Sequence, residues 1–145
     1  MFTAEEVFQA YYDCRRNKRN TPAQREFELR LERNLMGLCR ALNHGTYCVG
    51  RSIAFVISYP KWREVWAAHF RDRVVHHVLY NRVADRFYRR FIHDSYACIP
   101  GRGALMGVER VHRFMRQASE NWQRRAHFLQ ADLANFFVSI DKHIL

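Results

Sequence analysis

The sequence has few acidic residues, no long apolar run and no paired cysteines. Asp and Glu number 14 against 24 Lys and Arg, so the formal charge is +10 at pH 7. No apolar stretch approaches the roughly 18 residues that a membrane-spanning helix needs, and the acidic opening MFTAEEVF is unlike a secretory signal peptide. We therefore expect a cytoplasmic protein that has no membrane partner.

The chain also lacks the usual pattern of a zinc site. Its four cysteines are never spaced as CxxC, and its eight histidines are scattered. A structural zinc site requires paired ligands at short spacing. We therefore expect reduced thiols, as in a cytosolic protein, at Cys14, Cys39, Cys48 and Cys98.

What the chain has in excess is basic charge. A strongly basic protein favours a polyanionic partner such as nucleic acid, although some soluble domains are simply basic. Apolar residues make up 48% of the 145 residues and aromatic residues 14%, which is enough for one modest core and argues against bulk disorder.

The first part of the chain predicts helices. Thr3–Glu6 forms a capping box, and the basic stretch 15–20 is typical of a linker. Thr21-Pro22 then begins a second helix, for which Gly45 is the expected terminator. Its apolar stripe is Phe27, Leu31, Leu35, Leu38 and Leu42.

A hairpin is predicted next, because residues 53–57 alternate in polarity, Tyr59-Pro60-Lys61 is a turn sequence, and residues 63–67 can return as a second strand. A helix is then expected from Asp72 as its N-cap. The packed side of this helix is predicted to hold Val75, Leu79, Val83 and Phe87.

The last third predicts a loop at 94–103, a helix over 104–118 and a short buried strand at 126–132. A final helix is expected near Ser139 or Asp141. The inward face of the 104–118 helix is predicted to hold Val108, Val111, Phe114 and Met115.

Asp132 is the residue that most suggests chemistry. An acid at the tip of an apolar strand costs desolvation free energy unless it has a partner, and a bound cation is one such partner. The alternative is an Asp that caps the following turn.

Several sequence blocks in order carry a resemblance. They are REV at 63–65, FRDRVVHH at 70–77, FIHDSYAC at 91–98, GRG at 101–103, and ADL with FFVSID between 131 and 141. The series resembles the fingers and first palm segment of bacterial reverse transcriptases related to group II intron enzymes, over about residues 27–145. DSYAC at 94–98 is most similar to the enzymes of diversity-generating retroelements.

The resemblance implies an α+β fold that is part of a right-hand polymerase. Residues 1–48 would be an N-terminal helical segment, 49–125 the fingers with their β-hairpin, and 126–145 the start of the palm with its first strand. The implied partners are an RNA template, a DNA primer, a deoxynucleoside triphosphate (dNTP) and a small basic accessory protein.

The resemblance also implies an active site. Asp132 would be a catalytic residue, one of three carboxylates that hold two Mg²⁺ ions, and the backbone carbonyl of Leu133 would ligate one ion. Phe137 would lie under the incoming sugar, although core packing also explains such a residue. Arg63 and Lys61 would bind the triphosphate, Arg63 by a bidentate grip, although exposed cations at a turn are often only solvated.

Three further arginines are candidates for nucleic-acid binding. Arg71 and Arg73 flank the expected helix start, where one of them can instead pair locally. Arg102 lies in a Gly-Arg-Gly segment that allows close approach to a template backbone, and a turn alone explains this segment equally well. The family carries a basic residue where Ile99 stands.

The series stops before the aromatic-x-Asp-Asp turn that carries the other two carboxylates in this family. One carboxylate cannot hold two Mg²⁺ ions, so we expect catalysis to require a further palm segment and the 145-residue chain alone to be inactive. The alternative function is a non-catalytic basic RNA-binding module derived from such an enzyme.

Overall fold

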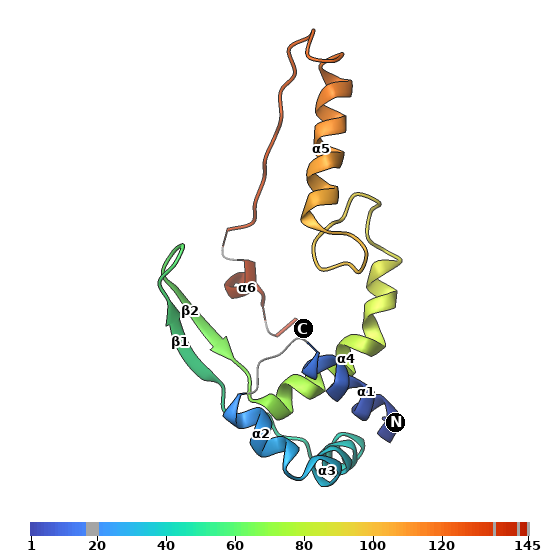
Figure 1. The fold of residues 1–145 in the computed structure, drawn as a ribbon, viewed down its shortest axis with the longest axis vertical. Coiled ribbons are helices and arrows are strands. Elements are labelled where there is room, and N and C mark those ends of the chain that lie inside the picture. Colours follow the sequence, from blue (N-terminus) through green and yellow to red (C-terminus); the bar gives the residue numbers. More distant parts are fainter. Residues whose placement is uncertain (17–20, 135, 142, 145) are drawn as a thin grey trace. The chain divides into compact units, whose positions relative to one another are not determined.

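The structure is a computed structural model that describes residues 1–16, 21–134, 136–141, 143 and 144. Its elements run α1, α2, α3, β1, β2, α4, α5 and α6 (Figure 1). The chain forms two compact units, Met1–Arg90 and Phe91–Leu145, and each is described by itself. The mixed α+β class is as predicted, and the predicted linker at 15–20 lies mostly outside the described residues.

Helix α1 (Ala4–Arg15) begins at the predicted capping box. The Glu6 amide donates to Thr3 Oγ1 at 3.2 Å, and the Thr3 amide donates to Glu6 Oε2 at 2.8 Å. Two amides that the first turn leaves unpaired are thereby satisfied.

The segment after Thr21 forms two helices, so the predicted single helix is wrong. Helix α2 (Pro22–Glu28) ends two residues before α3 (Leu31–His44) begins. Arg30, with φ −133°, breaks the helical path, and the Asn34 side chain donates to the Phe27 carbonyl at 2.7 Å. Gly45 ends α3 as predicted, in the left-handed conformation with φ +67°.

The start of the chain is fastened to α3 and α4. The Phe2 amide donates to Asn43 Oδ1 at 2.6 Å, and Asn43 Nδ2 donates to the Phe2 carbonyl at 2.8 Å. Arg82 donates to Glu6 Oε2 at 2.8 Å and to the Met1 carbonyl, with its guanidinium 4.0 Å from the centre of the Phe2 ring.

The predicted hairpin is confirmed. Strands β1 (Ile53–Ile57) and β2 (Arg63–Ala67) pair antiparallel, with Ile53 opposite Ala67 and Ile57 opposite Arg63. Neither strand has a buried residue, so the hairpin stands outside the core.

Helix α4 (Phe70–Tyr88) has His69 as its N-cap, three residues before the predicted N-cap. The predicted N-cap, Asp72, lies instead in the first turn and is only 1% exposed. The predicted packed side is confirmed only at Val75, since all the residues that α4 buries lie in its first half: Phe70, Asp72, Val74, Val75 and Val78. Leu79, Val83 and Phe87 are exposed.

The core of the first unit is formed by α1 to α4. Phe70 lies at its centre, with its ring 6.4 Å from that of Tyr11 and 5.3 Å from that of Phe27, both in edge-to-face arrangement. Its other members are Val7, Ala10, Cys14, Leu35, Leu38, Cys39, Val74, Val75 and Val78. The predicted stripe on α2 and α3 therefore does supply core residues.

The second unit contains α5 (Ala104–Ala118), whose bounds are those predicted. Its predicted inward face is wrong, because α5 buries none of its residues and Val108, Val111 and Phe114 are exposed. Before it, Ile99 pairs with Arg102 across a turn in which Gly101 has φ +74°.

The predicted palm strand at 126–132 is not formed. A strand needs a neighbour to satisfy its backbone groups, and the only sheet of the described residues is the hairpin. Helix α6 (Phe136–Ser139) ends where the final helix was expected to begin. Within the described ranges, no helix has both the length and the apolar character that crossing a membrane requires.

Candidate nucleic-acid interface

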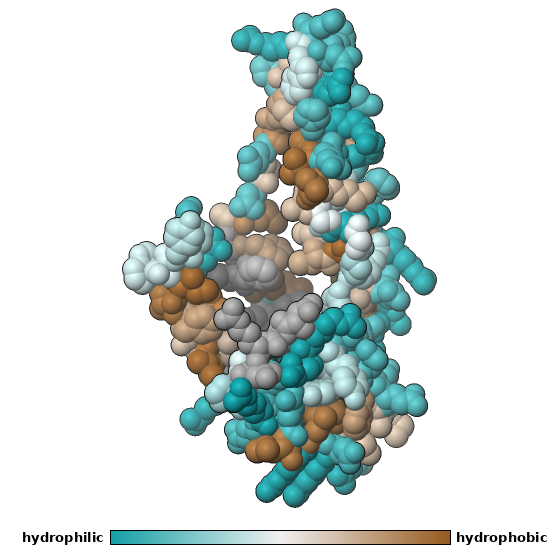
Figure 2. Space-filling model, in the orientation of Figure 1, coloured by the Kyte–Doolittle hydropathy of each residue, from teal (hydrophilic) through white to brown (hydrophobic). Residues whose placement is uncertain are grey.

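The hairpin presents two of the predicted binding residues. Lys61 lies in the connection between the strands, and Arg63 is the first residue of β2. Both are exposed. Figure 2 shows apolar residues at the surface of this hairpin, and Phe55 and Val56 are 46% and 62% exposed, so the cations stand beside an open apolar surface.

The strand register decides whether a neighbouring acid neutralises Arg63. Residues directly opposite in an antiparallel pair share a face, so Arg63 lies on the face of Ile57, Phe55 and Val65. Glu64 lies on the other face, opposite Val56. The ion pairs found among the described residues include neither Arg63 nor Lys61, which leaves both cations open to an anion.

Arg71 and Arg73 stand at the start of α4 and contact their own unit. Arg71 Nη2 donates to the Cys48 carbonyl at 2.8 Å, and its guanidinium lies 5.1 Å from the centre of the Tyr47 ring. The Arg73 guanidinium lies 5.9 Å from the centre of the Phe70 ring. Arg71 therefore helps to hold the segment that leads into β1, which agrees with the alternative that one of these arginines pairs locally.

Asp72 holds the same segment more firmly. Its Oδ1 accepts from the Tyr47 hydroxyl at 2.6 Å and its Oδ2 from the Gly50 amide at 2.8 Å. Burial and the hydrogen bond to Asp72 raise the pKa of Tyr47 to about 12. The sequence did not predict these two hydrogen bonds; the available signal was a tyrosine and a glycine just ahead of the predicted hairpin.

Arg102 contacts its own loop. Its Nη1 donates to the His93 carbonyl at 2.5 Å and to the Ser95 carbonyl at 3.5 Å. These contacts agree with the interpretation of the Gly-Arg-Gly segment as a turn, and the contact of Arg102 with a template stays a prediction.

Asp94 organises the same loop. It accepts from the Tyr96 hydroxyl at 2.6 Å and from Arg110 Nε at 2.8 Å. The hydrogen bond from Tyr96, assisted by Arg110, lowers the pKa of Asp94 to about 2. The loop is therefore joined to α5 by a charged contact.

Asp132 and Leu133 are exposed. They line a shallow hollow of about 490 Å³ whose other lining residues are Ala131 and Phe136. Phe137 lies in α6, and its side chain is outside the described part of the structure. Asp132 and Arg63 belong to different units, so no common site is described for them.

The residues present do not make a magnesium site. Mg²⁺ takes six oxygen ligands and usually binds through carboxylates. The hollow supplies one carboxylate, and the described ranges hold no group of three or more residues that could ligate a metal. We therefore assign no chemical step to the ion in this chain.

No protein-family model matches the chain, and no curated protein matches it. Among the predicted site residues, Lys61 and Arg63 both lie on the hairpin, and Arg71 and Arg73 both lie on α4.

Proposed function

We propose that this chain is the N-terminal part of an RNA-directed DNA polymerase, a reverse transcriptase that uses its fingers hairpin to bind template-primer and dNTP. Catalysis requires carboxylates beyond Asp132, supplied by a further palm segment. In this proposal the protein is cytoplasmic, and a small basic accessory protein is a further partner.

The hairpin carries the proposal. It places Lys61 and Arg63 at neighbouring exposed positions, and in the part of the chain that the structure describes neither pairs with a carboxylate. A guanidinium and an ammonium so placed suit a triphosphate or a nucleic-acid backbone. The hydrogen bonds from Tyr47 and Gly50 to Asp72 fix the segment that enters β1. They limit the positions that the hairpin can take.

The first test measures binding of a labelled RNA–DNA template-primer by fluorescence anisotropy. We expect affinity to fall steeply between about 50 and 200 mM salt, because bound cations release counterions. The double variant Lys61→Gln/Arg63→Gln should reduce the slope of log K against log salt by about 1 for each lost phosphate contact. The matched control is Arg25→Gln/Arg40→Gln, which removes the same charge from exposed positions on α2 and α3.

Affinity that does not depend on salt would contradict the proposal, and so would an equal slope change in the control. The alternative, a non-catalytic RNA-binding module, is favoured by the single carboxylate in the hollow around Asp132. The two functions differ in their response to dGTP with Mg²⁺. Quenching of the exposed Trp62, which lies between the two cations, is expected of the polymerase and not of the module.

A further inference from the structure

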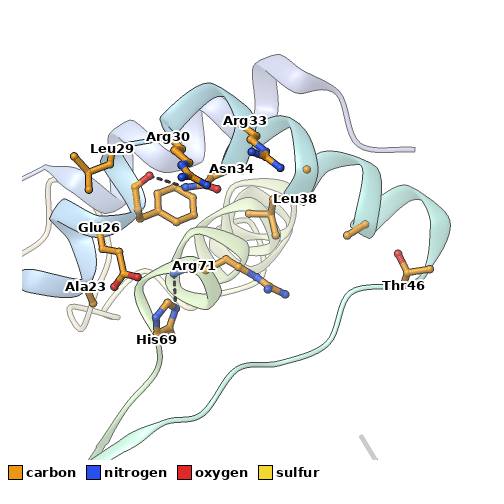
Figure 3. Close-up of a pocket in the computed structure, with 13 residues that line it drawn as sticks. Ala23, Glu26, Leu29, Arg30, Arg33, Asn34, Leu38, Thr46, His69 and Arg71 are labelled. Atoms are coloured by element: carbon orange, nitrogen blue, oxygen red, sulfur yellow. Dashed lines mark hydrogen bonds between the residues drawn. The ribbon is translucent and has the colours of Figure 1, made fainter.

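A second basic site lies on the first unit, in a cleft between α2, α3 and the start of α4. The cleft has a volume of about 780 Å³, which falls in the range of small-molecule sites. Figure 3 shows Arg30 and Arg33 on one wall, with His69 and Arg71 on the opposite wall. Lys61 and Arg63 do not line it.

The charge of the lining is positive. The lining contains three arginines, Arg30, Arg33 and Arg71, and one carboxylate, Glu26. The ion pairs recorded for the described residues do not include Glu26, so this carboxylate does not neutralise the arginines by contact. In the part of the chain that the structure describes, the side chains of Arg30 and Arg33 form no hydrogen bond, and both are exposed.

Arg71 provides an independent observation. One of its terminal nitrogens donates to the Cys48 carbonyl, but its Nε is buried and has no hydrogen-bond partner in the described structure. A buried donor that is left unpaired is costly. Among the described hydrogen bonds only Nη2 of Arg71 has a partner, so the hydrogen bonds within the protein leave part of this guanidinium for an anion in the cleft.

The base of the cleft is apolar. Phe27 and Leu38 line it, together with Ala23, Gly37 and Ala41. A Cβ added at Gly37 would meet no atom within 4 Å, so the small residues leave open space above the helix. Cationic walls over an apolar base suit a ligand that joins a phosphate to a ring.

We propose that this cleft binds a nucleoside phosphate. The phosphate lies between Arg30 and Arg33 on one wall and Arg71 on the other, and the nucleoside lies over Phe27 and Leu38. A free nucleotide and a residue of an RNA chain share this chemistry. The inference goes beyond the proposed function, because such a cleft does not require a polymerase.

The test uses the full 145-residue chain and three probes: AMP, adenosine and a ten-residue oligoadenylate. Isothermal titration calorimetry should show saturable binding of AMP or of the oligoadenylate, and at least about tenfold weaker binding of adenosine, because charge-assisted hydrogen bonds are lost. Binding of AMP assigns a free nucleotide as ligand; binding of the oligoadenylate alone assigns an RNA chain. Absence of binding of both would overturn the proposal.

Three variants place the binding in the cleft. Arg30→Gln/Arg33→Gln should weaken it at least about tenfold, whereas Arg40→Gln should change it less than about twofold, because Arg40 does not line the cleft and its Nε faces the Met36 carbonyl of its own helix. Gly37→Leu should fill the cleft and abolish binding, with folding checked by circular dichroism.

Equal weakening by Arg40→Gln would overturn the proposal, as would full binding to a folded Gly37→Leu variant. The hairpin variant Lys61→Gln/Arg63→Gln should keep the affinity of the cleft for AMP, because neither residue lines the cleft. The two proposals can therefore fail independently.

Discussion

At the scale of single residues, Asp72 links α4 to the segment that enters the hairpin. Replacement by Ala would leave the Tyr47 hydroxyl and the Gly50 amide without their acceptor. We expect Asp72→Ala to reduce the free energy of unfolding by about 3 kcal/mol, since each unpaired group costs about 1–3 kcal/mol. Urea denaturation measures this loss.

The control for that experiment is Asp85→Ala, an exposed acid on the same helix. It should change the free energy of unfolding by no more than about 0.5 kcal/mol. A similar loss in both variants would show that the buried hydrogen bonds of Asp72 do not carry its effect.

Gly37 within α3 and Gly45 at its C-cap predict opposite outcomes. Gly37 is helical and a Cβ there meets no atom within 4 Å, so Gly37→Ala should stabilise the protein by about 1 kcal/mol. Gly45 has φ +67°, and Gly45→Ala should destabilise it by about 1 kcal/mol because L residues are strained there. Thermal unfolding of both variants compares them, and the same sign for the two changes would contradict the argument.

At the scale of elements, local signals predicted what local forces decide. The capping box at Thr3, the terminator Gly45 and the bounds of α5 all follow from residues within a turn or two. The two strands of the hairpin followed from alternation and a short connection.

Long-range contacts decided what the sequence did not predict. Asp72 suits an N-cap by type, but its partners Tyr47 and Gly50 lie 25 and 22 residues away. Residues 126–132 have the apolar composition of a strand, yet strand formation depends on a neighbour. The cleft under Arg30 and Arg33 arises from the break between α2 and α3, which no helix-breaking residue marks.

At the scale of the whole molecule, paired carboxylates predict sensitivity to acid in both units. The hydrogen bond from Arg82 lowers the pKa of Glu6 from 4.5 to about 2, and that from Tyr96 lowers the pKa of Asp94 from 3.8 to about 2. Such groups contribute stability above their unfolded pKa, and the contribution is lost as pH falls through the folded pKa. We expect stability to fall from about pH 4.5 down to about pH 2, as measured by circular dichroism during acid titration.

Glu6→Gln should flatten that pH dependence, because the variant has no proton to take up at this position. Glu5→Gln serves as the control, since Glu5 lies in the same turn and makes no ion pair with another described residue. An unchanged acid profile in Glu6→Gln would contradict the assignment to the pair of Glu6 and Arg82.

The fastening of the first residues has a consequence for synthesis on the ribosome. Phe2 bonds to Asn43, and Arg82 bonds to Glu6 and the Met1 carbonyl. The Met1 carbonyl of the nascent chain therefore gains its partner Arg82 only after about eighty further residues have been made, and the packing of α1 on α4 is completed no earlier. Contacts between such distant positions delay folding, so we expect this unit to complete its folding only after α4 has left the ribosome.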